Sequence, residues 1–292
     1  MQAEPGRGAV AFGLDAPFGG ERGHDDDAPA VLCLTLDEAA RVLMRSPSSL
    51  SRIEKGLHHV PVRDLEYILG KYAVTDPAVR DRLFGWCRNG RKKGWWQRYA
   101  TDLSPEMMDF IGLEADATFI GLFELILVPG LLQTEAYARA LMEKGQFADD
   151  PERIHRLVAV RMLRQELLHR PDTPELWTII DEAALRRQIG GPKIMRTQLK
   201  HLIDASDLPE VRIQVIPFTT GTHRGVSGAS EILDIGDRGD LRIVTVDSLT
   251  VMSYREDESD IQAYGAAFDQ LRAAALSERE SQKLIAGLLS EL

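Results

Sequence analysis

The sequence predicts a mainly α protein with an α+β C-terminal domain, in which a small all-helical N-terminal domain precedes a larger mixed domain with a small sheet. Three observations predict this class. Apolar residues recur three or four positions apart from Leu34 to about Cys87. Further along, helical periods alternate with short β-rich runs bounded by turn residues. A length of 292 residues, with 44% hydrophobic and 27% charged residues, suits one large or two ordinary globular domains.

Charge is unevenly distributed along the chain. The formal net charge is −10, yet residues 31–100 carry thirteen Lys/Arg and seven Asp/Glu, whereas residues 101–292 carry twenty and thirty-two. A basic segment on an acidic body is typical of a nucleic-acid-binding module joined to another domain. The alternative is a solvated basic face without a partner.

Several classes of protein are disfavoured by the sequence. It contains no apolar run of membrane-spanning length and no signal-peptide pattern, so we expect a cytoplasmic protein with no membrane partner. Cys33 and Cys87 lie far apart without a CxxC pair, which argues against a disulfide framework. His58 and His59 are adjacent and cannot share a helix face, so we expect no metal and no other cofactor. No catalytic constellation stands out, and we expect that the chain is not an enzyme.

The N-terminal part is predicted to comprise a tail, a helical domain and a hinge. Residues 1–30 combine glycine, proline and an acidic cluster, which favours a disordered tail. Residues 31–88 contain four helical segments, LDEAARVL, SSLSRIEKG, VRDLEYILGKY and PAVRDRLFGWCR. Gly56 suits a helix end, and Pro61 and Pro77 suit helix starts. Residues 89–96 form a basic, tryptophan-containing hinge, whose tryptophans are expected to pack onto the second domain.

Residues 97–292 are predicted to form an α+β domain that senses a ligand or dimerises. FIGLFELILV (119–128) predicts a strand or strand pair, and Thr134 suits the cap of the helix that follows. A long amphipathic helix, PERIHRLVAVRMLRQELLHR, precedes the strand WTIID. Helices EAALRRQIG and KIMRTQLKHLIDAS come next, and then the β-rich runs VRIQVIPF, SEILDIG and LRIVTVDS. Two helices close the chain, the last one opening on a capping box at Ser277 and Glu280.

The stretch LTLDEAARVLMRSPSSLSRIEKG (34–56) is the candidate DNA-binding element. Its spacing fits two helices joined by a turn, with Leu50 and Ile53 facing inward and Ser46 capping the second helix. Unpaired amides at a helix N-terminus, short hydroxyl side chains and cations together suit phosphate and base contacts. The candidate DNA-binding residues are Arg45, Ser46, Ser48, Ser49, Ser51, Arg52 and Lys55. The alternative is an amphipathic helix hairpin with a serine-rich surface.

This stretch resembles the helix-turn-helix of Xre-family regulators without a gap. The remainder, from GWW through PGLLQTEAYARALM and QVIPF, resembles the C-terminal domain of actinobacterial WhiJ-like regulators. The resemblance implies a transcriptional regulator that binds double-stranded DNA as a homodimer. It also implies an antitoxin-like pairing with a small co-encoded partner protein.

The sequence departs from this family at several places. DDDAPAVLC stands where the family has an arginine-bearing first helix, so Glu54 lacks its usual partner. Met44 replaces the turn glycine, and a methionine with positive φ costs about 1 kcal/mol. Leu36 replaces a polar residue that often contacts phosphate in the family. The alternative function is therefore a protein-interaction module whose degraded helix-turn-helix no longer binds DNA.

The loop GTHRGVSGAS (221–230) is a second candidate site. It is glycine-rich and carries His223 and Arg224, which can line a pocket for an unknown small-molecule effector. An ordinary flexible connection between two strands is the alternative. An enzyme built around this loop is a further rival, although no catalytic partner residues support it.

Overall fold

The chain folds into two compact units, Met1–Gly94 and Trp95–Leu292. The structure is a computed structural model, and it describes residues 34–54, 60–89, 94–145, 148–236, 241–248 and 252–292. The predicted disordered tail, the helix end at Gly56, the adjacent histidines and residues 90–93 of the basic hinge lie outside these residues. Within the described ranges, no helix combines the length and the apolar character that crossing a membrane requires.

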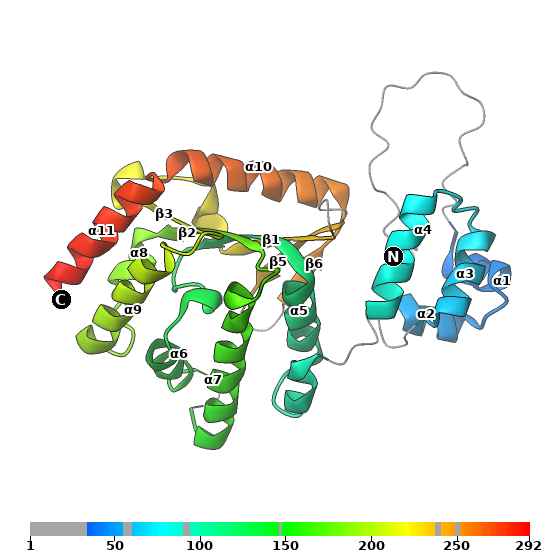
Figure 1. Cartoon of the computed structure of the whole chain (residues 1–292), viewed down its shortest axis with the longest axis horizontal. Coiled ribbons are helices and arrows are strands. Elements are labelled where there is room, and N and C mark those ends of the chain that lie inside the picture. The colour runs from blue at the N-terminus through cyan, green and yellow to red at the C-terminus, as the bar shows by residue number, and fades with distance from the viewer. Residues whose placement is uncertain (1–33, 55–59, 90–93, 146–147, 237–240, 249–251) are drawn as a thin grey trace, which may run out of the picture. The chain divides into compact units, whose positions relative to one another are not determined.

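The described part of the first unit contains the helices that the apolar spacing predicts (Figure 1). They are α1 (Leu36–Val42), α2 (Pro47–Glu54), α3 (Val62–Lys71) and α4 (Pro77–Asn89). A small core joins α1, α2 and α3 through the buried residues Ala39, Ala40, Leu43, Leu50 and Ile68. Ile53 was expected to share this core, but it is half-buried and lies outside the cluster. A residue three positions after Leu50 is turned about 60° away from it around the helix, which places Ile53 at the edge of the buried face.

Local side-chain caps set the starts of α1, α2 and α4. A capping box opens α1, in which the Thr35 amide donates to the Glu38 carboxylate over 2.8 Å. The Oγ of Ser46 accepts from the amide of Ser49 at 3.2 Å, as the sequence predicts for the start of α2. The carboxylate of Asp76 accepts from the amide of Ala78 at 2.7 Å and so caps α4.

A mixed six-stranded sheet organises the second unit, with strand order β3-β2-β1-β4-β5-β6. Its strands are β1 (Ala117–Glu124), β2 (Glu175–Asp181), β3 (Val211–Ile216), β4 (Ser230–Ile235), β5 (Leu241–Asp247) and β6 (Met252–Arg255). The first three strands pair in parallel, and β4, β5 and β6 continue the sheet in antiparallel fashion. Parallel neighbours require long crossover connections, and helices supply both of them.

Helices cover both faces of the sheet (Figure 1). The helix α10 (Glu258–Ala274) packs on one face, where Phe268 meets Phe123 in the smaller core. The larger core on the other face involves α5 (Pro105–Asp116), α6 (Glu135–Met142), α7 (Pro151–Gln165), α8 (Glu182–Arg186), α9 (Pro192–Ala205) and α11 (Glu278–Glu291). Along β1, Ile120 and Leu122 enter the larger core and Phe123 the smaller one, as the two-residue period of a strand requires. Trp95 and Trp96 pack against the larger core, as predicted.

The structure corrects several predicted boundaries. The strand expected over 119–128 ends at Glu124, because the backbone of Val128 bonds to side chains: its amide donates to the Tyr137 hydroxyl and its carbonyl accepts from Gln133. The helix expected over 182–190 ends at Arg186. The helix α5 was not predicted, although Ser104 followed by Pro105 is a recognisable start signal. The strand β6 was also missed, because four residues carry too little alternation.

Candidate functional site

The helix α2 presents a polar outer surface. Leu50 anchors the helix in the core with a fully buried side chain. Ser46, Ser48 and Arg52 are exposed, whereas Ser49 and Ser51 are half-buried. The Oγ atoms of Ser46 and Ser48 lie 3.2 Å apart at the N-terminal end of the helix. The Ser46 Oγ takes the Ser49 amide and Pro47 has no N–H, so this end offers the Ser48 amide beside its hydroxyl groups, which suits the binding of a phosphate oxygen.

The two arginines predicted to contact DNA have different surroundings. The guanidinium of Arg45 forms an ion pair with the Asp64 carboxylate of α3, and both side chains are about one-quarter exposed. Arg52 makes no hydrogen bond or ion pair with any residue that the structure describes. Of the two, Arg52 is the cation that is available to a partner, while Arg45 braces α2 against α3. Lys55 lies outside the described residues.

The turn between α1 and α2 has the positive φ at Met44 that the sequence predicts. Met44 has a φ of 51° and a side chain that is 83% exposed. A positive φ in a methionine places Cβ close to the carbonyl oxygen and strains the turn. The turn nevertheless closes, with the Arg45 amide donating to the Ala40 carbonyl over 2.9 Å.

The loop between β3 and β4 forms two short 3₁₀ turns, Phe218–Thr220 and Arg224–Ser227. The side chain of His223 is 5% exposed, and both ring nitrogens are engaged: Nδ1 accepts from the Gly225 amide and Nε2 lies 3.2 Å from the Asp181 carboxylate. The exposed Arg224 bonds to Gln270 of α10. His223 thus holds the loop against the sheet instead of presenting a free ring, and its candidate ligand role stays a prediction.

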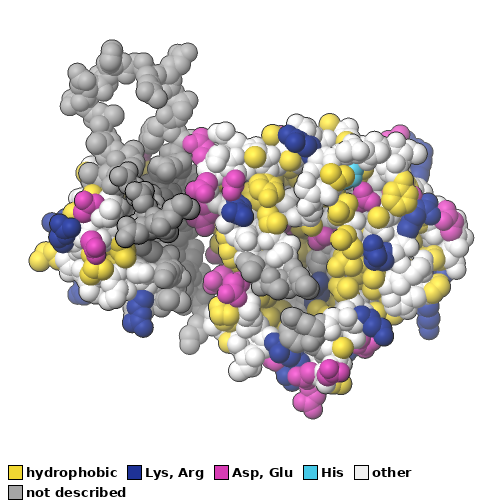
Figure 2. Space-filling view, turned by 180° about the vertical axis from the view of Figure 1, so that it is seen from behind, with side chains coloured by type: hydrophobic (Ala, Val, Ile, Leu, Met, Phe, Trp, Pro, Cys, Tyr) yellow, Lys and Arg dark blue, Asp and Glu magenta, His cyan; other side chains and the backbone are white. Residues whose placement is uncertain are grey.

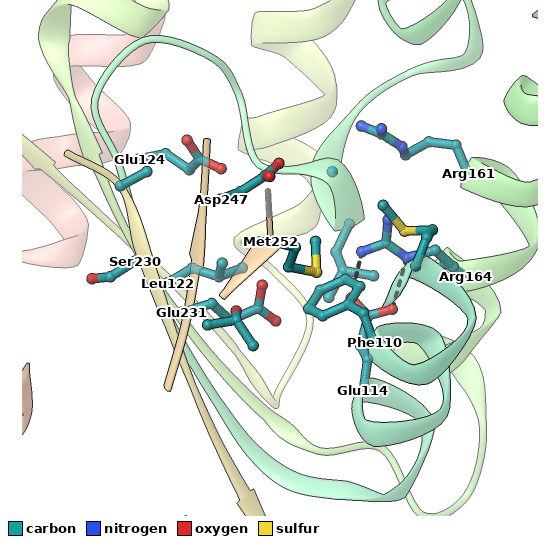
Figure 3. A pocket seen from close by; sticks show the side chains of 15 residues that line it. Phe110, Glu114, Leu122, Glu124, Arg161, Arg164, Ser230, Glu231, Asp247 and Met252 are labelled. Atoms are coloured by element: carbon teal, nitrogen blue, oxygen red, sulfur yellow. Dashed lines mark hydrogen bonds and ion pairs between the residues drawn. The ribbon is translucent and has the colours of Figure 1, made fainter. Parts of the chain in front are cut away.

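A polar cavity of about 150 Å³ lies between the sheet and the helices α5 and α7 (Figure 3). The far end of the same loop, Ala229 and Ser230, contributes to its wall. The strands supply the carboxylates of Glu124, Glu231 and Asp247. The helices supply Glu114, Arg161 and Arg164, which Figure 3 shows across the cavity from the strands.

The helix side of the cavity is held by a buried ion pair. The Arg164 guanidinium donates two hydrogen bonds to the Glu114 carboxylate, over 2.7 and 2.8 Å, and the two side chains are 9% and 3% exposed. The Arg164 guanidinium also lies 5.0 Å from the centre of the Phe110 ring. Bidentate geometry and burial make this pair strong and leave Glu114 with little capacity for another cation.

Three glutamines, of which Gln133 and Gln198 are buried, hold the segment beside Arg161. Arg161 donates to the Gln133 side chain over 2.8 Å, and Gln133 donates to the Val128 carbonyl over 2.7 Å. Gln165 and Gln198 bond to backbone carbonyls of the 3₁₀ turn Gly130–Leu132 and its neighbour Gln133. The segment PGLLQ is thereby fixed beside the cavity, where its Gln133 side chain accepts a hydrogen bond from Arg161.

Burial shifts the pKa values of the ionisable groups that line the cavity. It raises the pKa of Glu124 to about 7, against the opposing effect of Arg161 and with a contribution from Asp247. Burial likewise raises the pKa of Glu231, with the Glu114 carboxylate adding to it, and the pKa of Asp247. Burial, and then the charge of Arg164, lower the pKa of Arg161 to about 10. These carboxyl groups therefore hold protons to higher pH than exposed ones.

Family models match both units of the chain. Residues 107–287, more than half of the chain, match a family described as Domain of unknown function (DUF5753). The chain belongs to the DUF5753 family. Residues 33–83 match a Helix-turn-helix domain, which indicates a DNA-binding regulator. No curated protein and no solved structure matches the chain.

The polar cavity lies entirely within the DUF5753 domain, because its lining residues run from Met107 to Met252. Sequence reasoning missed its carboxylates, which are scattered over three strands and a helix. The available signal was the position of Glu124 and Asp247 at the last residue of a strand, and of Glu231 just before the apolar pair Ile232 and Leu233.

Proposed function

We propose that the chain is a DNA-binding transcriptional regulator that inserts the N-terminal end of α2 into the major groove of duplex DNA. The observation that carries the proposal is the outer surface of α2. It offers Ser46, Ser48 and Arg52, which has no hydrogen bond or ion pair with the described residues, while Leu50 holds the helix to a small core. The serine hydroxyls and the Ser48 amide suit phosphate contacts, and Arg52 suits a guanine edge.

The distribution of charge supports this division of roles. Residues 31–100 are net basic and residues 101–292 net acidic. On the face of the second unit seen in Figure 2, acidic and basic side chains are interspersed. A basic helical unit attracts the phosphate backbone, while an acidic unit is repelled from it.

A more specific form of the proposal rests on the resemblance to WhiJ-like Xre regulators. In that form the protein acts as a homodimer, pairs with a small co-encoded partner in an antitoxin-like way and responds to an effector. Light scattering tests the first point, because a homodimer has twice the monomer mass of 32.5 kDa. Arg45 is removed from the candidate DNA-binding residues, because its ion pair with Asp64 lets it brace α2 against α3. The other candidate residues are unchanged.

The decisive experiment is selection of duplexes from a random-sequence pool by the full-length protein at low ionic strength. Affinity for the enriched duplex is then measured by gel shift at several salt concentrations. We expect the logarithm of the affinity to fall linearly with the logarithm of salt, by about 0.9 per phosphate contacted. Failure to enrich any duplex, with or without a co-encoded partner, would contradict the proposal and favour a protein-interaction module.

Arg52→Ala tests the assigned contact. We expect a loss of about 1–3 kcal/mol on the enriched duplex if Arg52 reads a base, and a smaller loss on a scrambled one. Arg279→Ala is the matched control, because it removes the same charge from an exposed position of α11 in the second unit. Equal losses for the two variants would show that Arg52 contributes only general charge.

A further inference from the structure

The polar cavity of the DUF5753 domain contains more negative than positive groups. The ion pair between Glu114 and Arg164 is complete in itself. The guanidinium of Arg161 is then the only cation lining the described cavity that remains to balance Glu124, Glu231 and Asp247. Figure 3 shows these three carboxylates on the strand side and Arg161 across from them. Once they ionise, the cavity therefore has a surplus of negative charge.

A buried acceptor in the cavity has no donor among the residues that the structure describes. The Oε1 atom of Glu231 is shielded from solvent and lacks a hydrogen-bond partner among the described residues. The Glu124 carboxylate likewise makes no hydrogen bond or ion pair with the described part of the chain. Buried polar atoms are almost always satisfied, because an unmade hydrogen bond is costly. Both groups are acceptors when ionised, so a ligand that satisfies them is a hydrogen-bond donor.

The cavity has apolar walls beside these carboxylates. Phe110, Leu122, Leu131 and Met252 line it together with the acidic groups. Its volume of about 150 Å³ corresponds to about five water molecules at roughly 30 Å³ each. A ligand that fits has a cationic head and a short apolar body.

We propose that this cavity binds a small organic cation, an alkylammonium group that donates hydrogen bonds to Glu231 and Glu124 while its alkyl part packs on Phe110, Leu122 and Met252. An anion would add to the surplus of negative charge. A bare metal ion fits less well, since the described Asp, Glu, His and Cys side chains form no cluster with the arrangement of a metal site. The proposal concerns ligand binding alone and does not depend on DNA binding.

The ionisation of the cavity predicts how binding depends on pH. With a pKa of about 7, Glu124 loses its proton between pH 6 and pH 8, so the cation binds more tightly at pH 8. The charged and titratable groups around Glu124 come from α5, α6, α7, β4 and β5. They are Glu114, Tyr137, Arg161, Arg164, Glu231 and Asp247. Arg161 stays charged over this range because its pKa of about 10 lies above it.

The experiment uses the full-length protein without DNA and butylammonium chloride as the probe. Ligand-detected NMR measures a binding curve at pH 6 and pH 8, at constant ionic strength set with sodium chloride. We expect saturable binding with a dissociation constant on the order of 1 mM, as suits a ligand of about five heavy atoms. Tetramethylammonium, which carries the same charge without an N–H group, is the control and is expected to bind at least tenfold more weakly.

Glu231→Gln tests the assignment of the acceptor. The variant keeps the side-chain volume, and we expect at least tenfold weaker binding of butylammonium at pH 8. Glu152→Gln is the matched control, since the Glu152 carboxylate is 92% exposed on α7, and it is expected to bind as the unmodified protein does. Circular dichroism checks the fold, and Glu124→Gln provides the same test should Glu231→Gln unfold.

Three results would overturn the proposal. They are the absence of saturable butylammonium binding at pH 8, equal binding of butylammonium and tetramethylammonium, and unchanged binding in the folded carboxamide variant. Saturable binding that is selective for the N–H cation and is lost in that variant supports it.

Discussion

Replacing Glu124 by glutamine is expected to stabilise the second unit above neutral pH. The carboxyl group of Glu124 has a pKa of about 7 in the folded protein, against an ordinary value of 4.5, because it is buried. The folded state therefore binds this proton more tightly than the unfolded state does. Between pH 4.5 and about 7 the folded state holds more protons, so the free energy of unfolding falls as the pH rises through this window.

The structure sets the size of this effect. At about 1.36 kcal/mol per pH unit, the interval between 4.5 and about 7 corresponds to at most about 3 kcal/mol, reached in full near pH 8. Below pH 4.5 the group is protonated in both states and contributes nothing. Glu124→Gln removes the titration, so its stability relative to the unmodified protein is expected to rise by up to about 3 kcal/mol between pH 4 and pH 8.

The measurement is urea unfolding of the full-length protein at both pH values, followed by tryptophan fluorescence. Trp95, Trp96 and Trp177 lie in the second unit and report on its transition. Any packing change that glutamine causes is the same at both pH values, so the change with pH isolates the ionisation. Glu152→Gln, at an exposed position, serves as the control. A stability difference that is the same at pH 4 and pH 8 would refute the reasoning.

Three further substitutions test other features of the fold by the same unfolding measurement. Arg164→Met leaves the Glu114 carboxylate buried without its partner and is expected to destabilise the second unit by about 3–5 kcal/mol; a loss under 1 kcal/mol would show that the pair is not essential. Gly225→Ala places a Cβ 2.1 Å from the buried Phe123 ring and is expected to cost about 1–3 kcal/mol, with faster hydrogen exchange in the 223–228 loop; unchanged exchange would contradict the close approach. Met44→Gly relieves the positive φ at the turn and is expected to stabilise the first unit by up to about 1 kcal/mol, whereas a loss of stability would indicate that the turn is unstrained.

Much of the local structure followed from short-range signals. The caps at Ser46, Thr134 and Ser277 were all predicted, and each accepts the expected backbone hydrogen bond. These interactions join residues three positions apart, so the sequence around them suffices. Met44 was predicted to strain the turn, and its φ of 51° confirms a positive value.

Sequence reasoning was least informative where long-range contacts decide the structure. The strand expected to reach Val128 stops at Glu124, because side chains of Gln133 and Tyr137 take the backbone groups that a neighbouring strand would use. Arg45 was predicted to contact DNA, and its ion pair with Asp64 depends on how α3 packs. His223 was a candidate pocket residue, and its burial depends on the ring of Phe123 and on Asp181 at the end of β2.

The sequence by itself determined the helical character of the first unit, the mixed class of the second and the polar outer surface of α2, because periodicity and capping act over a few residues. The tertiary structure alone decided which charges meet. Glu124 and Asp247 are more than a hundred residues apart in the sequence, and Glu231 lies between them. Only the pairing of β1 with β4 and of β4 with β5 brings these three residues to one cavity. Burial in that cavity then sets their pKa values, since desolvation is a property of the folded surroundings and not of the residue.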